Sequence, residues 1–311
     1  MQITSDIDIR EGILRRKGDL LDILLMDRTT KKNIIWATDS YEHRGKGFGA
    51  KKHIHPDLVT GTYNKLIQPR AAKSIEEQRQ RTREKAEVFT PLKTVDQINK
   101  LIDWSDDSHF PNGPSWQQYV MELKLEISCG EAPFIVSRYN PTAHTGKLIK
   151  IENRVGFLDR KLRVVSRHCK TEKEWKYWAL EAFKASYGYE WQGDNVLIAR
   201  ENLLYTMIDY FKTKFNKSPS LAIQQEFAEV IAFNLFQMDG LKYVSPMSCK
   251  HETKITMGKI SIFDGEEPDI VEKYECEGCK FNRPANHNGK YVKIMDWNKG
   301  KSIKFVDLIG K

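Results

Sequence analysis

Between residues 85 and 245, segments with helical spacing of apolar residues alternate with short apolar segments, and this alternation restricts the fold more than any other feature. Helices interleaved with short strands indicate an α/β fold with a mainly parallel sheet. We predict helices at residues 95–102, 172–187, 195–215 and 220–241, and strands at 119–128 and 187–191. The chain is 40% apolar and 11% aromatic, which is enough for a globular core.

Three polar or flexible positions follow the predicted strands. In open α/β folds, small ligands bind at the carboxyl ends of parallel strands. The turn "SCGEAPF" contains Gly130, which has no side chain to block a ligand from the backbone. Glu190 ends "YGYE", where an acid can accept hydrogen bonds from ribose hydroxyls. Asp239 in "FQMDGL" could accept from an adenine amine, although an Asp-Gly pair is also a common plain turn.

Two stretches carry a resemblance to a known family. The motif "AEVFTP" at residues 86–91, followed by a helix and then by "EISCGEAPF", resembles the gamma-type amino-methyltransferases of restriction–modification systems. Members of that family transfer a methyl group from S-adenosylmethionine to the adenine amine in DNA. The whole chain looks similar to the short proteins labelled restriction endonuclease subunit M. The resemblance therefore implies a Rossmann-like methyltransferase fold and DNA adenine-N6 methyltransferase activity.

The resemblance also implies roles for individual residues of the cofactor site. In the family, the "FTP" turn holds the methionine end of S-adenosylmethionine, a second turn lies beneath it, and acids at two strand ends bind the nucleoside. The matching residues here are Phe89, Thr90 and Pro91 for the first turn, Ser128, Cys129, Gly130 and Glu131 for the second, and Glu190, Trp191 and Asp239 for the nucleoside. The resemblance places Trp191 near the adenine ring, although a tryptophan beside a strand end is more often part of the core.

The catalytic signature of the family, an Asp, Asn or Ser followed by Pro-Pro and an aromatic residue, is missing because the chain contains no Pro-Pro. The stretch "KYVKIMDWNKGK" offers a replacement, since Asp296 could accept the amine and Trp297 could stack on a flipped base. A lone Ser-Pro at residues 245–246 leaves less room for a strand. Two alternatives stay open: a catalytically inactive cofactor- or DNA-binding partner or regulator, and a methyltransferase acting on RNA or another base.

A Cys/His-rich segment predicts a structural zinc site. Cys276-x-x-Cys279 is a pair with the spacing of a zinc knuckle, and Cys249 together with His251 or His287 could complete four ligands. We take His251 as the fourth ligand in the predicted set. The alternatives are reduced cysteines in a loop and, less favoured, a redox pair.

Charge and cysteine usage bear on partners and location. The net charge of +8 and the isoelectric point near 9.0 favour a polyanionic partner, which we expect to be double-stranded DNA held by residues 44–55 and 65–85. Surplus surface lysines are the plain alternative. Because the family's target-recognition domain has no counterpart here, a specificity or nuclease partner subunit is a further candidate. No apolar run approaches the roughly 18 residues that span a bilayer, and five cysteines do not suggest a secreted disulfide framework, so we expect a cytoplasmic protein.

These features divide the chain into four parts. We predict a basic helix-rich N-terminal segment at residues 1–84, an S-adenosylmethionine-binding core at 85–247, a Cys/His insertion at 248–290, and the final strands of the core at 291–311.

Overall fold

The computed structural model describes residues 15, 18–85, 87–103, 115–143, 146–256, 260–261, 265–266 and 270–309. The protein has a mixed α/β fold whose centre is a three-stranded parallel sheet. The strands are β3 (Lys124–Glu126), β4 (Ser186–Glu190) and β5 (Leu235–Gln237), and they lie in the order β3-β4-β5. This confirms the α/β class and the parallel pairing of the central strands.

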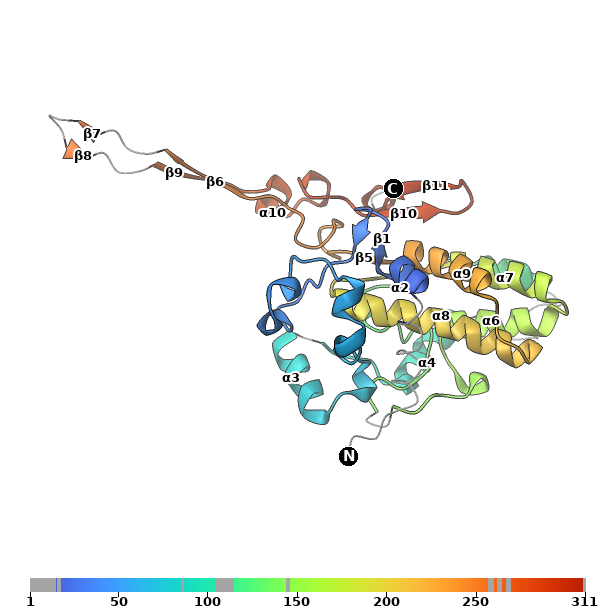
Figure 1. The fold of residues 1–311 in the computed structure, drawn as a ribbon. Helices are drawn as coiled ribbons and strands as arrows, with labels where there is room; N and C mark the ends of the chain where they lie inside the picture. The colour runs from blue at the N-terminus through green and yellow to red at the C-terminus, as the bar shows by residue number, and fades with distance from the viewer. Residues whose placement is uncertain are drawn as a thin grey trace.

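Four helices make the two crossovers between these strands. Helices α6 (Phe157–His168) and α7 (Glu172–Lys184) connect β3 to β4, and α8 (Gly193–Phe215) and α9 (Leu221–Asn234) connect β4 to β5. They pack on one another at one side of the body, and α7, α8 and α9 all contact β4 (Figure 1). A Thr171 capping box starts α7, where the hydroxyl accepts a hydrogen bond from Glu174 N.

The two faces of the sheet have different neighbours because side chains alternate along each strand. Gly188 lies against the main core, where an added Cβ would be 2.8 Å from Leu235 Cδ1. The next residue, Tyr189, points the other way and contacts Phe236 and Phe305 in a second apolar cluster. That cluster is closed by the antiparallel hairpin of β10 (Lys293–Asp296) and β11 (Lys301–Lys304).

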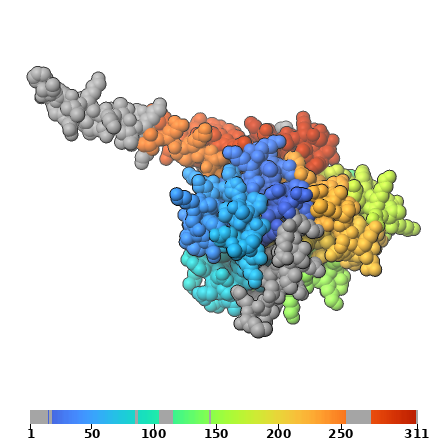
Figure 2. Space-filling view, viewed as in Figure 1, coloured from blue at the N-terminus to red at the C-terminus, as the bar shows by residue number. Residues whose placement is uncertain are grey.

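The N-terminal part forms a layer over one side of the body, which Figure 2 shows as the blue surface beside α9. Its regular elements are α2 (Gly18–Leu25), β1 (Met26–Asp27), β2 (Lys32–Asn33) and α3 (Ile75–Lys85). Helices α4 (Leu92–Leu101) and α5 (Trp116–Met121) follow along the chain, and α5 packs against α6 and α7. Short 3-10 turns lie at Glu42–Arg44, Lys46–Phe48, Pro56–Leu58, Gly61–Tyr63, Arg70–Ala72, Ile151–Asn153, Pro284–Asn286 and Phe305–Leu308. Residues 18–72 are therefore less regularly helical than predicted.

A narrow two-stranded arm projects from the body (Figure 1). It consists of β6 (Glu252–Thr256) paired antiparallel with β9 (Ile270–Tyr274), and β7 (Ile260–Ser261) pairs with β8 (Gly265–Glu266) farther out. The short helix α10 (Glu277–Phe281) lies at the base of the arm. Within the described part of the chain, no helix has both the length and the apolar character needed to cross a bilayer.

Two predicted boundaries and one predicted sheet assignment are wrong. Residues 119–121 of the predicted strand lie in helix α5, because Ser115 and Gln118 form a capping box that starts a helix there. Helix α9 ends at Asn234, whose side-chain amide donates to three carbonyl groups around the start of β4, and β5 begins at the next residue. The strands predicted to complete the core, β10 and β11, form a separate antiparallel sheet.

Candidate functional site

Three cysteines and one histidine converge at the base of the arm. The ligand atoms of Cys249, Cys276, Cys279 and His287 all lie within 4.8 Å of one another. Each of the three sulfur atoms is 3.6 Å from His287 Nδ1. Three thiolates and one imidazole are a donor set that suits a tetrahedral structural Zn²⁺ site. The cluster could therefore hold a zinc ion, with no position left open for a substrate.

Local backbone structure positions Cys276 and His287 in this cluster. Cys276 precedes α10, and its sulfur accepts a hydrogen bond of 3.2 Å from Asn288 N. Burial opposes the charged thiolate, but backbone hydrogen bonds from Asn288 and Cys279 outweigh it and lower the pKa of Cys276 to about 6. Gly278 lies directly against His287, and an added Cβ would be 2.6 Å from the imidazole ring. Glycine in the knuckle therefore makes room for the histidine ligand.

The fourth residue of the cluster is His287, and the prediction of His251 was wrong. His251 is exposed and immediately precedes β6, where the chain leaves the cluster for the arm. His287 is instead buried, and its backbone N–H donates to Tyr291 Oη at 2.8 Å. The same hydroxyl donates to Pro284 O, which closes the turn that carries His287 under the knuckle.

Two sequence-distant turns meet around a cavity of about 510 Å³ beside β3. Five of the predicted cofactor residues line it: Phe89, Thr90, Ser128, Cys129 and Gly130. Gly130 has φ +53°, and an added Cβ would lie 3.0 Å from the Phe89 ring. A side chain at residue 130 would therefore be strained and would crowd the contact between the two turns.

Glu190 holds the turn at Gly130 from the end of the neighbouring strand. Its carboxylate accepts hydrogen bonds from Gly130 N at 2.9 Å and from Gln192 N at 3.0 Å. The side chain is largely buried, and burial raises the pKa of Glu190 above its ordinary value despite these hydrogen bonds. The structure thus brings Glu190 and the turn together at the carboxyl ends of β4 and β3.

Neither Glu190 nor the other four predicted cofactor residues line this cavity. Pro91 is the residue before α4, and Trp191 donates its indole N–H to Ala37 O at 2.8 Å. Glu131 is buried and accepts from Arg70 N at 2.6 Å and from Tyr139 Oη at 2.7 Å. Asp239 closes its own turn, because Oδ1 accepts from the backbone of residues 241 and 242.

Asp296 and Trp297 lie at the opposite end of the sheet from Gly130. They line a second cavity of about 540 Å³ together with Ala185 and Tyr187 at the start of β4. Trp297 donates its indole N–H to Asn234 Oδ1 at 2.8 Å, and Asp296 Oδ1 accepts from Lys299 N at 3.1 Å. Because β10 pairs with β11 and not with β3, its end does not reach the carboxyl edge of the parallel sheet. The predicted catalytic pair is therefore not next to the predicted cofactor turn.

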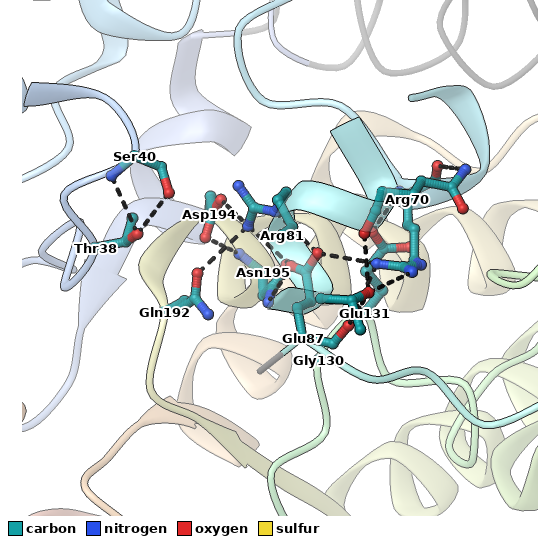
Figure 3. A network of polar contacts seen from close by, with 12 residues as sticks. Thr38, Ser40, Arg70, Arg81, Glu87, Gly130, Glu131, Gln192, Asp194 and Asn195 are labelled. Atoms are coloured by element: carbon teal, nitrogen blue, oxygen red, sulfur yellow. Dashed lines mark hydrogen bonds and ion pairs between the residues drawn. The ribbon is translucent and has the colours of Figure 1, made fainter. Parts of the chain in front are cut away.

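A buried ionic network joins the N-terminal segment to the core, and the sequence patterns did not reveal it (Figure 3). Arg81 of α3 donates to both oxygens of Glu87, at 2.9 and 2.8 Å, and to Asp194 Oδ2 at 2.9 Å. Tyr41 donates its hydroxyl to the same Asp194 oxygen at 2.8 Å. Burial disfavours the charge of Asp194, but Arg81 more than compensates, so the pKa of Asp194 is lowered. The only local signal is that Glu87 lies inside "AEVFTP".

The two predicted basic segments face each other across a polar cavity of about 560 Å³. Arg44 lines it from the first segment and Lys65, Lys73 and Arg81 from the second, along with the carboxylates of Asp39, Glu77 and Glu84. Among the described side chains of these segments, seven lysines and arginines are exposed: Arg44, Lys46, Lys51, Lys52, Lys65, Arg79 and Arg83. In contrast, Arg70 and Arg81 are engaged with Glu87 inside the protein.

These observations define a mixed α/β protein with a Cys₃His cluster at the base of the arm. No protein-family description, no curated protein and no solved structure matches the chain.

Proposed function

We propose that the protein binds S-adenosylmethionine in the cavity between residues 89–90 and 128–130, as part of a DNA adenine methylation system. The observation that carries this proposal is the convergence of the two turns, separated by almost forty residues, on one cavity whose glycine turn is held by Glu190. In a Rossmann-like fold, the first parallel strands present such a turn and a strand-end acid to a nucleoside cofactor. The cavity volume of about 510 Å³ lies within the range of small-molecule sites.

A free polar group at the cavity fits a cofactor that carries an amine. Asn99 lines the cavity and is buried, and among the described residues its Oδ1 has no hydrogen-bond partner. A buried acceptor without a partner costs free energy, so an amine donor from a ligand would stabilise it. The Glu190 carboxylate is buried behind the Gly130 turn and does not line the cavity, so its support for the cofactor is indirect, through the hydrogen bond that holds Gly130 N.

The proposed nucleic-acid partner rests on charge. The exposed basic residues of 44–55 and 65–85 lie on two segments that border the same polar cavity. Lysine and arginine side chains spaced in this way neutralise phosphates irrespective of base sequence. We therefore expect binding to duplex DNA that weakens steeply with salt.

A second function is favoured by the position of Asp296 and Trp297. Their distance from the Gly130 turn, at the other end of the sheet, leaves the predicted methyl-transfer step without its acceptor residues. A catalytically inactive cofactor- or DNA-binding partner of a methyltransferase would need only the cavity and the basic segments. Methyl transfer to RNA or to another base would make the same demands on the cofactor cavity.

The first test is calorimetric titration with S-adenosylmethionine. Ile98 of α4 lines the cavity, and Ile98→Trp should fill part of it and weaken binding at least tenfold. Leu101, one helical turn later, is exposed and does not line the cavity, so Leu101→Trp is a matched control that should bind like the wild type. No heat with the wild-type protein, or equal binding by all three proteins, would contradict the proposed cofactor site.

A tritium-methyl transfer assay then separates the candidate activities. Label in duplex DNA would identify a DNA methyltransferase, and label in RNA only would identify an RNA-directed enzyme. Cofactor binding without transfer to either nucleic acid would favour the non-catalytic partner.

A further inference from the structure

The edge of the parallel sheet at β3 is open. Within the described part of the chain, β3 pairs with β4 on one side and with no strand on the other. Lys124 N donates toward β4, to Ala185 O, so the backbone groups of Leu125 face the open edge. Such an edge is a ready template for another strand, and proteins usually protect it with charged residues, proline or a covering segment.

Exposed apolar side chains occupy this edge, in place of the charged residues, proline or covering segment that usually prevent pairing with another strand. Leu123, Leu125 and Ile127 are 69%, 43% and 67% exposed. Leu123 and Leu125 lie between the two cavities described above, so there is free space on both faces of the edge. Further exposed apolar residues border the edge, namely Ile98, Ile102, Met121 and Leu308. Contiguous exposed apolar surface of this kind marks an interaction site.

We propose that a second copy of the chain covers this edge, with β3 of each copy pairing antiparallel about a twofold axis at Leu125. Residues 122–128 read "ELKLEIS". Read outward from Leu125, this stretch has a polar residue on each side at 124 and 126 and then an apolar residue on each side at 123 and 127. Antiparallel pairing places Leu123 opposite Ile127 of the second copy and Leu125 opposite its own equivalent. A twofold interface requires this kind of self-complementarity, whereas a strand from an unrelated partner would not.

Charge complementarity supports the same register. The pairing sets Lys124 opposite Glu126 of the second copy, and directly opposed residues of antiparallel strands have Cβ atoms about 4.5–5.5 Å apart. Glu126 is buried, and none of the ion pairs between described residues includes it; its carboxylate accepts only from the backbone N–H groups of Phe134 and Ile135. Burial without a cation raises the pKa of Glu126 to about 8. Lys124 is itself buried, with Nζ 3.2 Å from Glu122 Oε2 and donating to Ile102 O at 3.1 Å, so the pairing would bring a positive charge near Glu126 while Lys124 keeps its own partners.

The assembly would join two three-stranded sheets into one sheet of mixed pairing, which is common when an antiparallel strand adds to a parallel sheet. The apolar borders on each face would then meet their own equivalents across the axis. Leu123, Leu125 and Ile127 also line the cavity beside β3, so a second copy would border that cavity. The proposal concerns assembly alone, and its test does not use S-adenosylmethionine.

Light scattering after size exclusion tests the proposal on the full-length, zinc-loaded chain. We expect the wild-type protein to elute with twice the chain mass of 36.2 kDa. Leu125→Lys places two like charges at the axis and should raise the dimer dissociation constant at least 100-fold, giving a monomer. Leu241→Lys changes a leucine that is 81% exposed in the loop after β5, away from β3, and should remain dimeric.

A cross-linking experiment addresses the register independently of how well Leu125→Lys folds. Leu125→Cys puts two thiols next to each other at the axis, so a short bis-maleimide should convert most of the protein to a covalent dimer. Leu241→Cys and the wild-type protein, which carries the five native cysteines, give the background. A monomeric wild-type protein, a dimer that Leu125→Lys leaves intact, or cross-linking of Leu125→Cys no greater than background would each overturn the proposal.

Discussion

Replacing His287 should release zinc from the Cys₃His cluster, whereas replacing His251 should not. His287 Nδ1 is 3.6 Å from each of the three cysteine sulfurs, and its ring is buried against Gly278. His251 is exposed and outside the cluster although it is only two residues from Cys249. His287→Ala and His251→Ala are therefore a matched pair that distinguishes the spatial ligand set from the one suggested by sequence proximity.

The size of the effect follows from the coordination. Loss of even an outer-shell partner weakens metal sites by about 10–100-fold, so loss of one of four ligands should weaken zinc binding by ~100-fold or more. When the metal is present at about 100 times the wild-type dissociation constant, it contributes about 2.7 kcal/mol to the free energy of unfolding. His287→Ala should lose most of this contribution, and His251→Ala should keep it.

Zinc content after dialysis and urea unfolding with and without a chelator measure both quantities. We expect one zinc per chain in the wild-type protein and in His251→Ala, and much less than one in His287→Ala. Zinc-free wild-type protein whose unfolding is unaffected by added zinc or chelator would show that the cluster is not a metal site. Equal zinc loss in the two variants would refute the ligand set derived from the structure.

Two further predictions concern buried charges. Asp194→Asn should lower the free energy of unfolding by about 3 kcal/mol in urea titrations, because it leaves the buried Arg81 with one carboxylate partner fewer and breaking buried pairs typically costs about 3–5 kcal/mol. Tyr41→Phe removes a single hydrogen bond to Asp194 and should cost only about 1 kcal/mol. Equal effects of the two variants would argue against the network. In the monomeric Leu125→Lys variant, the pKa of Glu126 is about 8, so between the ordinary pKa of a glutamate and pH 8 the folded state keeps a proton that the unfolded state has lost. The contribution of Glu126 to the free energy of unfolding is therefore complete below its ordinary pKa and is lost as the pH rises toward 8. Glu126→Gln should flatten that dependence, which can reach about 5 kcal/mol, in unfolding titrations between pH 5 and 9; an unchanged slope would contradict the prediction.

Local sequence signals were sufficient for the central architecture. The alternation of helical and strand-like segments predicted the α/β class and the strand at β4, since periodicity reports which face of an element is buried. The Cys276–Cys279 knuckle could also be predicted, because two ligands three residues apart meet through local backbone geometry alone. Element ends were less predictable: a capping box at Ser115 turned part of a predicted strand into α5, and the carbonyl contacts of Asn234 accompany the change from α9 to β5.

Only the tertiary structure decided which distant residues meet. His287 replaces His251 in the cluster because the chain after α10 folds back beneath Gly278. Asp296 and Trp297 end at the wrong edge of the sheet for the predicted role, because β10 pairs with β11. Arg81 and Asp194 are more than a hundred residues apart, and no pattern along the chain links them. Periodicity and spacing describe interactions within a few residues, whereas strand order and the packing of one segment on another depend on contacts that close long loops.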